Sequence, residues 1–411
     1  MRGGKMRHDY EIAVGPIHPA LKEPIMLRLT IEGEEIVDVD VIASQNHRGI
    51  EWIGMNRNNP IQSLYLAERI CGICNFCHPS DLVMAIEEIA DIEVPERAQY
   101  IRVIQGELER IHSHLLWAGV AAHEIGFDSL LHYTWMVREK VMDVLEAVNG
   151  NRVTKAIIMY GGVRRDIDEE RAKLIRKMCS YYLEAFDKLA NLFLKDETIK
   201  KRTREIGILK KEDALKLAAA GPTARASGVK KDVRQDFPYF AYPDFDVHAI
   251  TPDELLGYTV GDVYDRIVVR LLEVKQSVEI IEEALNNMPS GDIIAEKKLV
   301  KLMAKIKSSE GEAVARYEAP RGEDIHYVML KKGYEPLYSW KVRAPTYINI
   351  LSWRPMLLGY QIADIPIIAA SIDPCLSCTN RFAVVKNGEE KIIDADYFHR
   401  LSVQKTRRLM K

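Results

Sequence analysis

The sequence predicts an α+β fold in which a large central antiparallel helical bundle carries small β-sheets built from the N- and C-terminal segments. Three observations predict this class. Apolar and polar residues alternate in residues 1–55, apolar residues recur at three- and four-residue steps through 80–290, and short strand-like segments return in 320–411. No internal repeat or long linker divides the 411 residues, so we expect a single domain spanning 1–411.

The N-terminal segment has the pattern of a half-buried β-hairpin. Apolar residues alternate with polar ones on both sides of a turn at Gly33. They are Leu27, Leu29 and Ile31 before the turn, and Val37, Val39 and Val41 after it. Because side chains two positions apart share one face of a strand, each arm should bury one face and expose the other.

The middle of the chain predicts four long helices. Pro95 suits a first helical turn, and an apolar stripe follows it as far as Leu115. Further helices are expected over 129–148, 168–194 and 263–288, the last with apolar residues spaced 4, 3, 4, 3 and 4 apart. That spacing suits packing in an antiparallel bundle.

Near the C-terminus the sequence predicts one more hairpin. The segments 382–385 and 391–393 flank Asn387-Gly388, a favoured two-residue turn. We expect this hairpin to be docked as a structural element of the fold.

Composition excludes several classes of protein. The net charge of −3 shows no basic excess, so no nucleic-acid partner is expected. The most apolar stretch, 355–372, is interrupted by Gln361, Asp364 and Pro366, and the first residues lack the apolar core of a signal peptide. We therefore expect the cytoplasm as the compartment. Eight Gln beside abundant Glu and Lys indicate a hot-environment source.

Five of the six cysteines gather in two places. Cys71 and Cys74 form one CxxC pair with Cys77 close behind, and Cys375 and Cys378 form a second pair. The pairs are 301 positions apart (375 − 74), so only the tertiary fold could join them. Spacing alone permits a zinc site, an iron–sulfur cluster, another soft-metal centre, or unconnected free thiols.

The residues around the cysteines are more specific. ERICGICNFCH begins at Glu68, and DPCLSCTNR begins at Asp373. Both resemble the signature motifs of nickel–iron hydrogenase large subunits. GPIHPALKEP, HRGIEWIGM and EAPRGE, which begin at Gly15, His47 and Glu318, resemble the energy-converting, membrane-bound branch and the related 49 kDa-type subunit of complex I. The resemblance covers nearly the whole chain.

The resemblance implies roles for seven residues. Cys71 and Cys375 would be terminal nickel ligands, and Cys74 and Cys378 would bridge nickel to iron, so that a nickel–iron centre is bound. Glu23 would shuttle protons, Arg321 would lie over the metal, and Asp373 would hold Arg321. As structural alternatives, Glu23 would be a surface carboxylate, Arg321 a member of an ion pair, and Asp373 a turn cap.

Three further residues would lie at the cavity of such a site. His18 matches the histidine that faces quinone in the complex I relatives, although a hydrogen bond to local backbone is also open. His78 would donate to a thiolate or simply pack. Cys77 departs from the hydrogenase pattern and would be a ligand, a redox partner or a bystander. We expect structural roles for His112, His114 and Cys179.

A second departure concerns the end of the chain. In nickel–iron hydrogenases a protease removes the tail after the residue that corresponds to Arg381, once nickel is inserted. Here 30 residues (411 − 381) follow Arg381. The retained tail fits either a precursor or a branch that is never processed, such as the sulfur-reducing membrane complexes of heat-loving archaea.

Three functions follow as hypotheses, all for an oxidoreductase subunit of a ferredoxin-linked, ion-pumping membrane complex. The tail favours a sulfane sulfur (polysulfide) reductase whose large subunit binds no cofactor itself and walls the cavity at a partner's terminal iron–sulfur cluster. The alternative is a hydrogen-evolving nickel–iron hydrogenase. The third is a non-catalytic coupling subunit, as in complex I.

The resemblance also implies the partners and the location. The expected partners are a small iron–sulfur subunit, other hydrophilic subunits, membrane-embedded ion-pumping subunits, and ferredoxin as the electron donor. Through them the chain would lie peripherally on the cytoplasmic face of the cell membrane.

Overall fold

The computed structural model describes residues 9–19, 21–43, 45–379, 384–386, 389–391 and 395–410. Its strands are β1 Asp9–Val14, β2 Met26–Glu32, β3 Glu35–Ile42, β4 Ile158–Met159, β5 Gly162–Val163, β6 Gly311–Ala319, β7 Gly322–Leu330, β8 Ser339–Arg343, β9 Val384–Lys386 and β10 Glu389–Lys391. Its α-helices are α1 Ile50–Asn56, α2 Pro60–Ala67, α3 Cys77–Ile89, α4 Glu96–Glu124, α5 Asp128–Asn149, α6 Glu169–Lys195, α7 Glu197–Thr203, α8 Lys211–Lys216, α9 Gly221–Arg225, α10 Val233–Asp236, α11 Asp253–Leu256, α12 Val263–Asn287, α13 Leu299–Ser308, α14 Pro345–Asn349, α15 Trp353–Leu357, α16 Ile365–Ser371 and α17 Ala395–Leu409.

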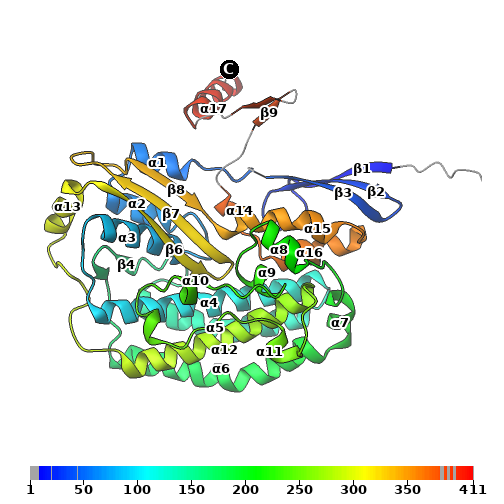
Figure 1. Cartoon of the computed structure of the whole chain (residues 1–411), viewed down its shortest axis with the longest axis horizontal. Coiled ribbons are helices and arrows are strands. Elements are labelled where there is room, and N and C mark those ends of the chain that lie inside the picture. The colour runs from blue at the N-terminus through cyan, green and yellow to red at the C-terminus, as the bar shows by residue number, and fades with distance from the viewer. Residues whose placement is uncertain are drawn as a thin grey trace, which may run out of the picture.

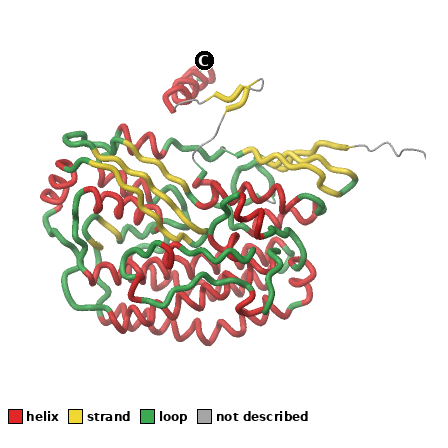
Figure 2. Tube along the Cα trace, viewed as in Figure 1, coloured by secondary structure: helices red, strands yellow, loops and turns green. Residues whose placement is uncertain are grey.

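The four longest helices form the bundle at the base of the molecule (Figures 1 and 2). Helix α4 packs against α5 and α12, and α6 packs against the same two helices. The predicted α+β class with a central helical bundle is therefore confirmed.

The ends of these helices follow ordinary capping chemistry. Pro95 precedes α4, and Gly150 ends α5 in the left-handed conformation that glycine tolerates best. The side chains of Asp168 and Asp262 accept backbone N–H groups at the starts of α6 and α12. The predicted helix limits agree with the observed ones except in α4. The sequence predicts an apolar stripe as far as Leu115, whereas the helix continues to Glu124.

The N-terminal hairpin forms as predicted, with one error of register. Strands β2 and β3 pair antiparallel, and β1 extends them to a three-stranded sheet. Pairing shifts between Thr30 and Ile31, so that Ile31 faces Ile36 and Val37 is the extra residue of a bulge. Val37 is consequently 40% exposed while Ile36 is fully buried, because the bulge reverses the face to which Val37 points.

The second sheet, β6-β7-β8, lies above the bundle with α3 packed against β6 and β7 (Figure 1). Strand β6 begins at Gly311, earlier than the strand-rich region predicted from residue 320. The segment after β8 is mostly helical, in α14, α15 and α16. These helices are too short to show a clear apolar period in the sequence.

Part of the C-terminal hairpin prediction can be compared with the structure. Strands β9 and β10 pair antiparallel, whereas Phe382, Ile393 and the turn at Asn387-Gly388 lie outside the described residues. Figure 1 draws β9 and α17 apart from the main body, so the expected docking on the fold is not seen. The single-domain organisation, tail included, stays a prediction.

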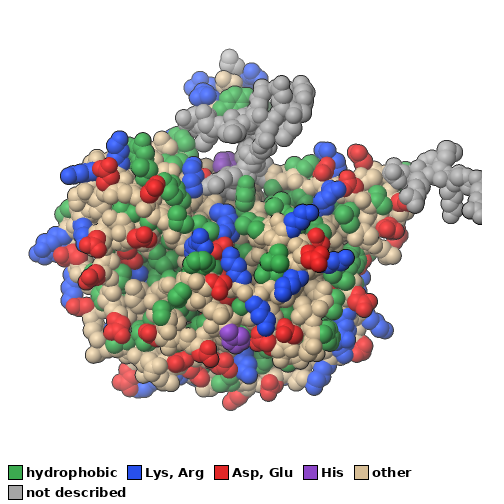
Figure 3. Space-filling view, in the orientation of Figure 1, with side chains coloured by type: hydrophobic (Ala, Val, Ile, Leu, Met, Phe, Trp, Pro, Cys, Tyr) green, Lys and Arg blue, Asp and Glu red, His purple; other side chains and the backbone are tan. Residues whose placement is uncertain are grey.

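Two surface features complete the description. Among the described residues, no helix combines the length and the apolar character needed to cross a membrane. On the face drawn in Figure 3, acidic and basic side chains are interspersed over the main body.

Candidate functional site

The first cysteine pair lies in the loop between α2 and α3. The backbone N–H groups of Ile73 and Cys74 point back to Cys71 Sγ, at 3.3 and 3.1 Å. Cys71 is fully buried and Cys74 is 3% exposed. The CxxC turn thus gives the first sulfur two backbone donors, which favours its thiolate form.

The second pair follows α16 and is held by a single 3-10 turn, Leu376–Cys378. The Cys375 N–H donates to Thr346 Oγ1 at 3.1 Å, and the Cys378 N–H donates to the Cys375 carbonyl at 3.1 Å. Both cysteines are buried. The turn presents both sulfurs on the side that faces the first pair.

The two distant pairs meet in one buried cluster. Cys375 Sγ lies 3.0 Å from Cys71 Sγ and 3.0 Å from Cys378 Sγ. The sulfurs of these three residues all lie within 4.8 Å of one another, and Cys74 joins them through a hydrogen bond with Cys71. Sequence spacing could not decide whether the pairs would meet, and the fold brings them together.

Arg48 ties the two cysteine loops to each other. Its guanidinium donates to the carbonyls of Arg69 and Ile70, at 2.7 and 2.6 Å, and to the carbonyl of Ser377, at 2.7 Å. The sequence predicts no such role for Arg48, whose segment HRGIEWIGM contributes only to the family resemblance.

Arg321 lies directly on the cluster. Its Nη1 donates to Cys74 Sγ at 2.8 Å and to Ser113 Oγ at 3.2 Å. On the other side, Nε donates to the Asp373 carbonyl at 2.7 Å and Nη2 to Asp373 Oδ1 at 2.8 Å. Asp373 has a positive φ of 55°, which lets its carbonyl and its carboxylate face the same guanidinium.

The pKa values of the thiols in the cluster are shifted in different directions. Hydrogen bonds from the Cys375 and Cys378 thiols hold the pKa of Cys71 well below its usual value. Hydrogen bonds with Cys71 and Cys77, together with burial, raise the pKa of Cys74, and burial raises that of Cys378. Burial opposes the charge on Arg321, but Asp373 and the neighbouring sulfurs raise its pKa well above the ordinary value. The buried, positively charged Arg321 side chain therefore lies beside thiols that would lose their protons on binding a metal.

A buried ionic network fixes the turn that carries Arg321. Arg110 Nη2 donates to the Glu318 carbonyl at 2.7 Å, and Arg225 Nη1 donates to Glu318 Oε1 at 2.8 Å. Glu107 pairs with Arg110 in turn. All these side chains are at most 2% exposed, so the β6–β7 turn rests on a rigid base.

Gly322, the residue after Arg321, gives a first prediction. A Cβ at this position would stand 2.5 Å from the Gly221 backbone nitrogen, and φ is +123°. We expect Gly322→Ala to lower the free energy of unfolding by about 3 kcal/mol or more, from strain and overpacking together. Denaturant unfolding measures this. Gly333→Ala is the control, because Gly333 has φ +78° with nothing within 4 Å, and should lose only about 1 kcal/mol. Equal losses would contradict the close-packing argument.

Glu23 reaches the second cysteine loop from the N-terminal segment. Its carboxylate accepts hydrogen bonds from the backbone N–H groups of Leu376 and Ser377 and from Ser377 Oγ. Its side chain also lines a cavity of about 410 Å³, whose walls are mainly apolar. Cys375, Asp373 and Gly72 line the same cavity, as do Trp117, Trp135 and Trp353. Glu23 therefore stands between an apolar cavity and the thiol cluster.

The place of His18, Cys77 and His78 at the cavity of a partner's cluster stays a prediction. His18 is exposed in the loop before β2, and Cys77 and His78 are buried in the first turn of α3. None of them lines the 410 Å³ cavity. His78 nevertheless approaches the cluster, since its Nε2 lies 3.6 Å from Cys378 Sγ.

The residues expected to be structural are buried in the helices. His112 lies 3.3 Å from the Ile73 carbonyl, and His114 Nε2 lies 2.7 Å from Glu273 Oε2. Cys179 is fully buried in α6. None of the three lines the 410 Å³ cavity.

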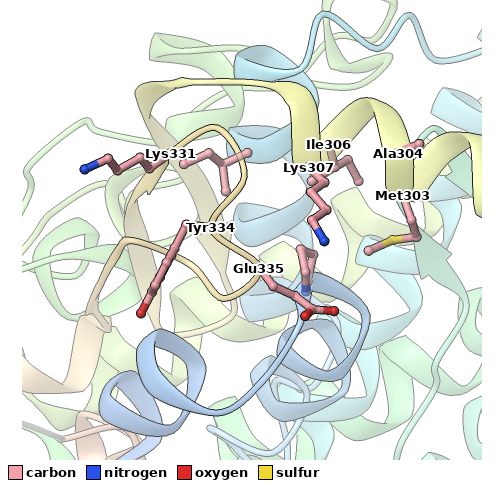
Figure 4. Close-up of a pocket in the computed structure, with 9 residues that line it drawn as sticks. Met303, Ala304, Ile306, Lys307, Lys331, Tyr334 and Glu335 are labelled. Atoms are coloured by element: carbon pink, nitrogen blue, oxygen red, sulfur yellow. The ribbon is translucent and has the colours of Figure 1, made fainter.

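A second, smaller pocket lies between α13 and the loop that follows β7 (Figure 4). Lys307, Tyr334 and Glu335 are among the residues that line it. No residue predicted for the site contributes to its walls.

The donor set fits a thiolate-bound soft-metal centre. Three buried thiols converge and the buried thiol of Cys74 contacts that of Cys71, and soft sulfur ligands suit nickel, iron and zinc alike. Cys375 also borders an open cavity, whereas a closed zinc site needs no access. A helical bundle that brings two distant CxxC pairs together beside an arginine and a glutamate defines the hydrogenase-type class of large subunits.

Comparison with known proteins agrees with this class. Residues 124–381 match the family described as "Respiratory-chain NADH dehydrogenase, 49 Kd subunit", and residues 48–118 match "Nickel-dependent hydrogenase". The chain therefore belongs to the family of nickel–iron hydrogenase large subunits and complex I 49 kDa-type subunits, in its energy-converting, membrane-bound branch. The family predicted from the motifs is confirmed.

Three relatives illustrate the range of the family. The chain is 48% identical to the membrane-bound hydrogenase subunit alpha of Pyrococcus furiosus, over 98% of this chain and 95% of that one. It is 39% identical to the carbon monoxide-induced hydrogenase of Rhodospirillum rubrum, over 90% and 99%. A solved structure of the membrane-bound sulfane sulfur reductase, an archaeal respiratory membrane complex, matches with a TM-score of 0.84 and 30% identity, over 92% and 100%.

Proposed function

We propose that this chain is the catalytic large subunit of a hydrogen-evolving, membrane-bound nickel–iron hydrogenase. The observation that carries the proposal is the complete site: four converging thiols, Arg321 on Cys74, and Glu23 on the loop of Cys375 and Cys378. A subunit that only walled a partner's cluster would need none of these groups. The 48% identity to a membrane-bound hydrogenase subunit supports the same choice.

Cys71, Cys74, Cys375 and Cys378 would hold the nickel–iron centre, which would supply the redox chemistry that joins two protons and two electrons into hydrogen. The chain's own contribution is electrostatic and geometric. Arg321 holds its positively charged guanidinium against the Cys74 sulfur, and Asp373 fixes the orientation of that guanidinium. Arg48 holds the two cysteine loops together by donating hydrogen bonds to backbone carbonyls of both.

Glu23 would hold the proton on its carboxylate, between the cavity and the Cys375 loop. We expect Glu23→Gln to lower hydrogen evolution about 100-fold while nickel content stays unchanged, because Gln keeps the shape but cannot carry a proton. Turnover and nickel content of the purified complex measure this. Glu34→Gln, a change at an exposed turn, is the matched control. Full turnover of the Glu23 variant would exclude the shuttle role.

The second candidate is the sulfane-reducing type that the tail favoured. The structural match to a sulfane sulfur reductase supports it. A complex of this type would pass electrons through a partner's terminal iron–sulfur cluster to polysulfide, and the four thiols of this chain would bind no metal. The tail is weaker evidence for the function than the residues of the site, because a segment that is removed after translation is still present in the encoded sequence.

The proposal includes partners and a location. Electrons would come from ferredoxin through a small iron–sulfur subunit, and membrane-embedded subunits would pump ions and anchor the chain peripherally on the cytoplasmic face. The relatives are named for membrane-bound complexes, which supports this arrangement. A non-catalytic coupling role is the third candidate, and the intact thiol set argues against it.

Substrate assays separate the first two candidates. The complex, reduced by ferredoxin, is supplied with protons alone or with polysulfide. We expect hydrogen without polysulfide and no faster electron consumption when polysulfide is added. Sulfide formation without hydrogen would overturn the proposal in favour of the second candidate.

A further inference from the structure

Helix α12 carries two buried arginines on the side where it packs against α16. Arg266 and Arg270 are one turn apart, so they share a side of the helix, and neither is more than 1% exposed. Among the described residues, no carboxylate forms an ion pair with either of them; the nearby Asp373 pairs with Arg321 instead. A buried charge is costly unless an opposite charge offsets it. The two arginines therefore depend on neutral acceptors or on charges beyond direct contact.

Neutral acceptors satisfy Arg266 but not Arg270. Arg266 Nη1 donates to Ser371 Oγ at 3.1 Å, and its Nη2 donates to the carbonyls of Gly207 and Gly261, both at 2.9 Å. Arg270 Nη1 donates to the Arg266 carbonyl at 3.0 Å, while its Nε and Nη2 have no hydrogen-bond partner in the described part of the chain. Because nearly all buried polar groups are hydrogen-bonded, the two open nitrogens of Arg270 are unusual.

An aromatic ring covers one face of the Arg270 guanidinium. The central carbon of the guanidinium lies 4.0 Å from the centroid of the Trp117 ring, within the range of a cation–π contact. Trp117 Nε1 donates to the Ala370 carbonyl at 2.7 Å, and Trp117 and Asp373 both line the 410 Å³ cavity. Arg270 therefore lies behind a residue of the cavity wall.

Two carboxylates act on Arg270 from a distance. Burial lowers the pKa of Arg270 to about 10, and the negative charges of Asp373 and Glu273 oppose this change, with Asp373 the stronger of the two. The guanidinium is therefore still charged at neutral pH. Glu273 is already occupied, because Arg225 and His114 each contact one of its oxygens.

Asp373 is the carboxylate with an open oxygen. Its Oδ1 accepts from Arg321 Nη2 at 2.8 Å, whereas Oδ2 has no hydrogen-bond partner among the residues that the structure describes. Asp373 is also the charge that most strongly raises the pKa of Arg321. One buried carboxylate therefore balances two guanidinium groups, that of Arg321 in direct contact and that of Arg270 outside ion-pair distance.

We propose that Arg270 is a positioning residue of the site, which acts through Asp373 on the orientation of Arg321. This role rests on the function proposed above, in which Arg321 lies beside a metal ligand. The positive charge of Arg270 attracts the Asp373 carboxylate from the side of α12, so that Oδ1 and the Asp373 carbonyl stay in line with Arg321. Trp117 holds the guanidinium in place and separates it from the cavity.

The first test uses the full chain prepared without metal, so its outcome does not depend on hydrogen evolution. Denaturant unfolding measures the effect of Asp373→Asn in the parent chain and in a chain with Arg270→Met, which keeps an apolar stem against Trp117. We expect Asp373→Asn to raise the unfolding equilibrium constant at least about fivefold more in the parent, because only there does it leave two arginines without their counter-charge. Additive effects of the two changes would overturn the proposal.

Three further variants separate charge from packing in the same measurement. Arg270→Lys keeps the charge, so the coupling with Asp373→Asn should persist. Arg266→Met removes an equally buried arginine on which Asp262 and Asp265 act instead, so its effect should add to that of Asp373→Asn. Arg270→Gln provides the uncharged variant if the methionine variant does not fold. Equal coupling for the lysine variant and the uncharged variant would show that the charge of Arg270 plays no part, and would overturn the proposal.

The second test uses the purified complex. We expect Arg270→Met to lower hydrogen evolution about tenfold with full nickel content, and Arg270→Lys to restore most of the turnover. Because Arg270 acts through Asp373, Arg270→Met should cause no further loss when Asp373→Asn is already present. Full turnover of the Arg270→Met complex, or the same tenfold loss in the Asp373→Asn complex, would overturn the positioning role. A parent complex that evolves no hydrogen would refute the proposed function, whereas the coupling in the metal-free chain would still decide whether Arg270 acts on Asp373.

Discussion

Replacing Cys71 with serine is expected to remove nickel from the purified complex and to lower hydrogen evolution by more than about 100-fold. Residues that merely support a metal ligand already change affinity 10- to 100-fold when altered, so loss of a ligand should exceed that range. Cys71 also receives two backbone N–H groups and contacts the Cys375 sulfur, so no neighbouring thiol can take its place without moving the loop.

Cys179→Ala is the matched control for this change. Cys179 is equally buried but lies in α6 and lines no part of the cavity at Cys375. We expect full nickel content and full turnover. If the Cys71 variant keeps its nickel and its activity, the four thiols are not the site of the reaction.

The second large effect is expected at Arg321. Arg321→Lys keeps the charge but loses the planar fork that reaches Cys74, Ser113 and Asp373 at the same time. We expect turnover to fall about 100-fold, comparable to the loss of one preorganised donor in other active sites, with nickel content unchanged. Parallel measurement of turnover and nickel content tests this.

Asp373→Asn is the companion variant. Asn keeps a side-chain oxygen for Arg321 Nη2 but removes the negative charge, and the Asp373 carbonyl still accepts from Nε. We expect a smaller loss of turnover than for the lysine variant. A larger loss would show that Asp373 acts by its charge rather than by orienting Arg321.

The sequence predicted those parts of the fold that have a long, regular pattern. The four long helices follow from repeated apolar spacing, and Asn149-Gly150 marked the end of α5. The errors fell where the pattern is short or interrupted. Val37 was assigned to the buried face because a bulge cannot be recognised from alternation alone. Helices such as α14 and α16, of five and seven residues, are fixed by tertiary contacts rather than by period.

The site was predictable where chemistry demands particular residue types. Two CxxC pairs, a glutamate and an arginine in family motifs identified the components, and the fold brings them together. Arg48 could not be assigned, because its role depends on backbone carbonyls from loops more than 300 residues apart (377 − 69 = 308). His18 lies exposed in the loop before β2, and its place at a partner's cavity stays a prediction. Backbone acceptors and loop paths leave no residue-type signal in a single sequence.

Elemental analysis of the intact, active complex tests the central claim most directly. If Cys71, Cys74, Cys375 and Cys378 hold a nickel–iron centre, nickel should be present at one atom per large subunit and disappear in the Cys71→Ser complex. An active complex that contains no nickel would contradict the account.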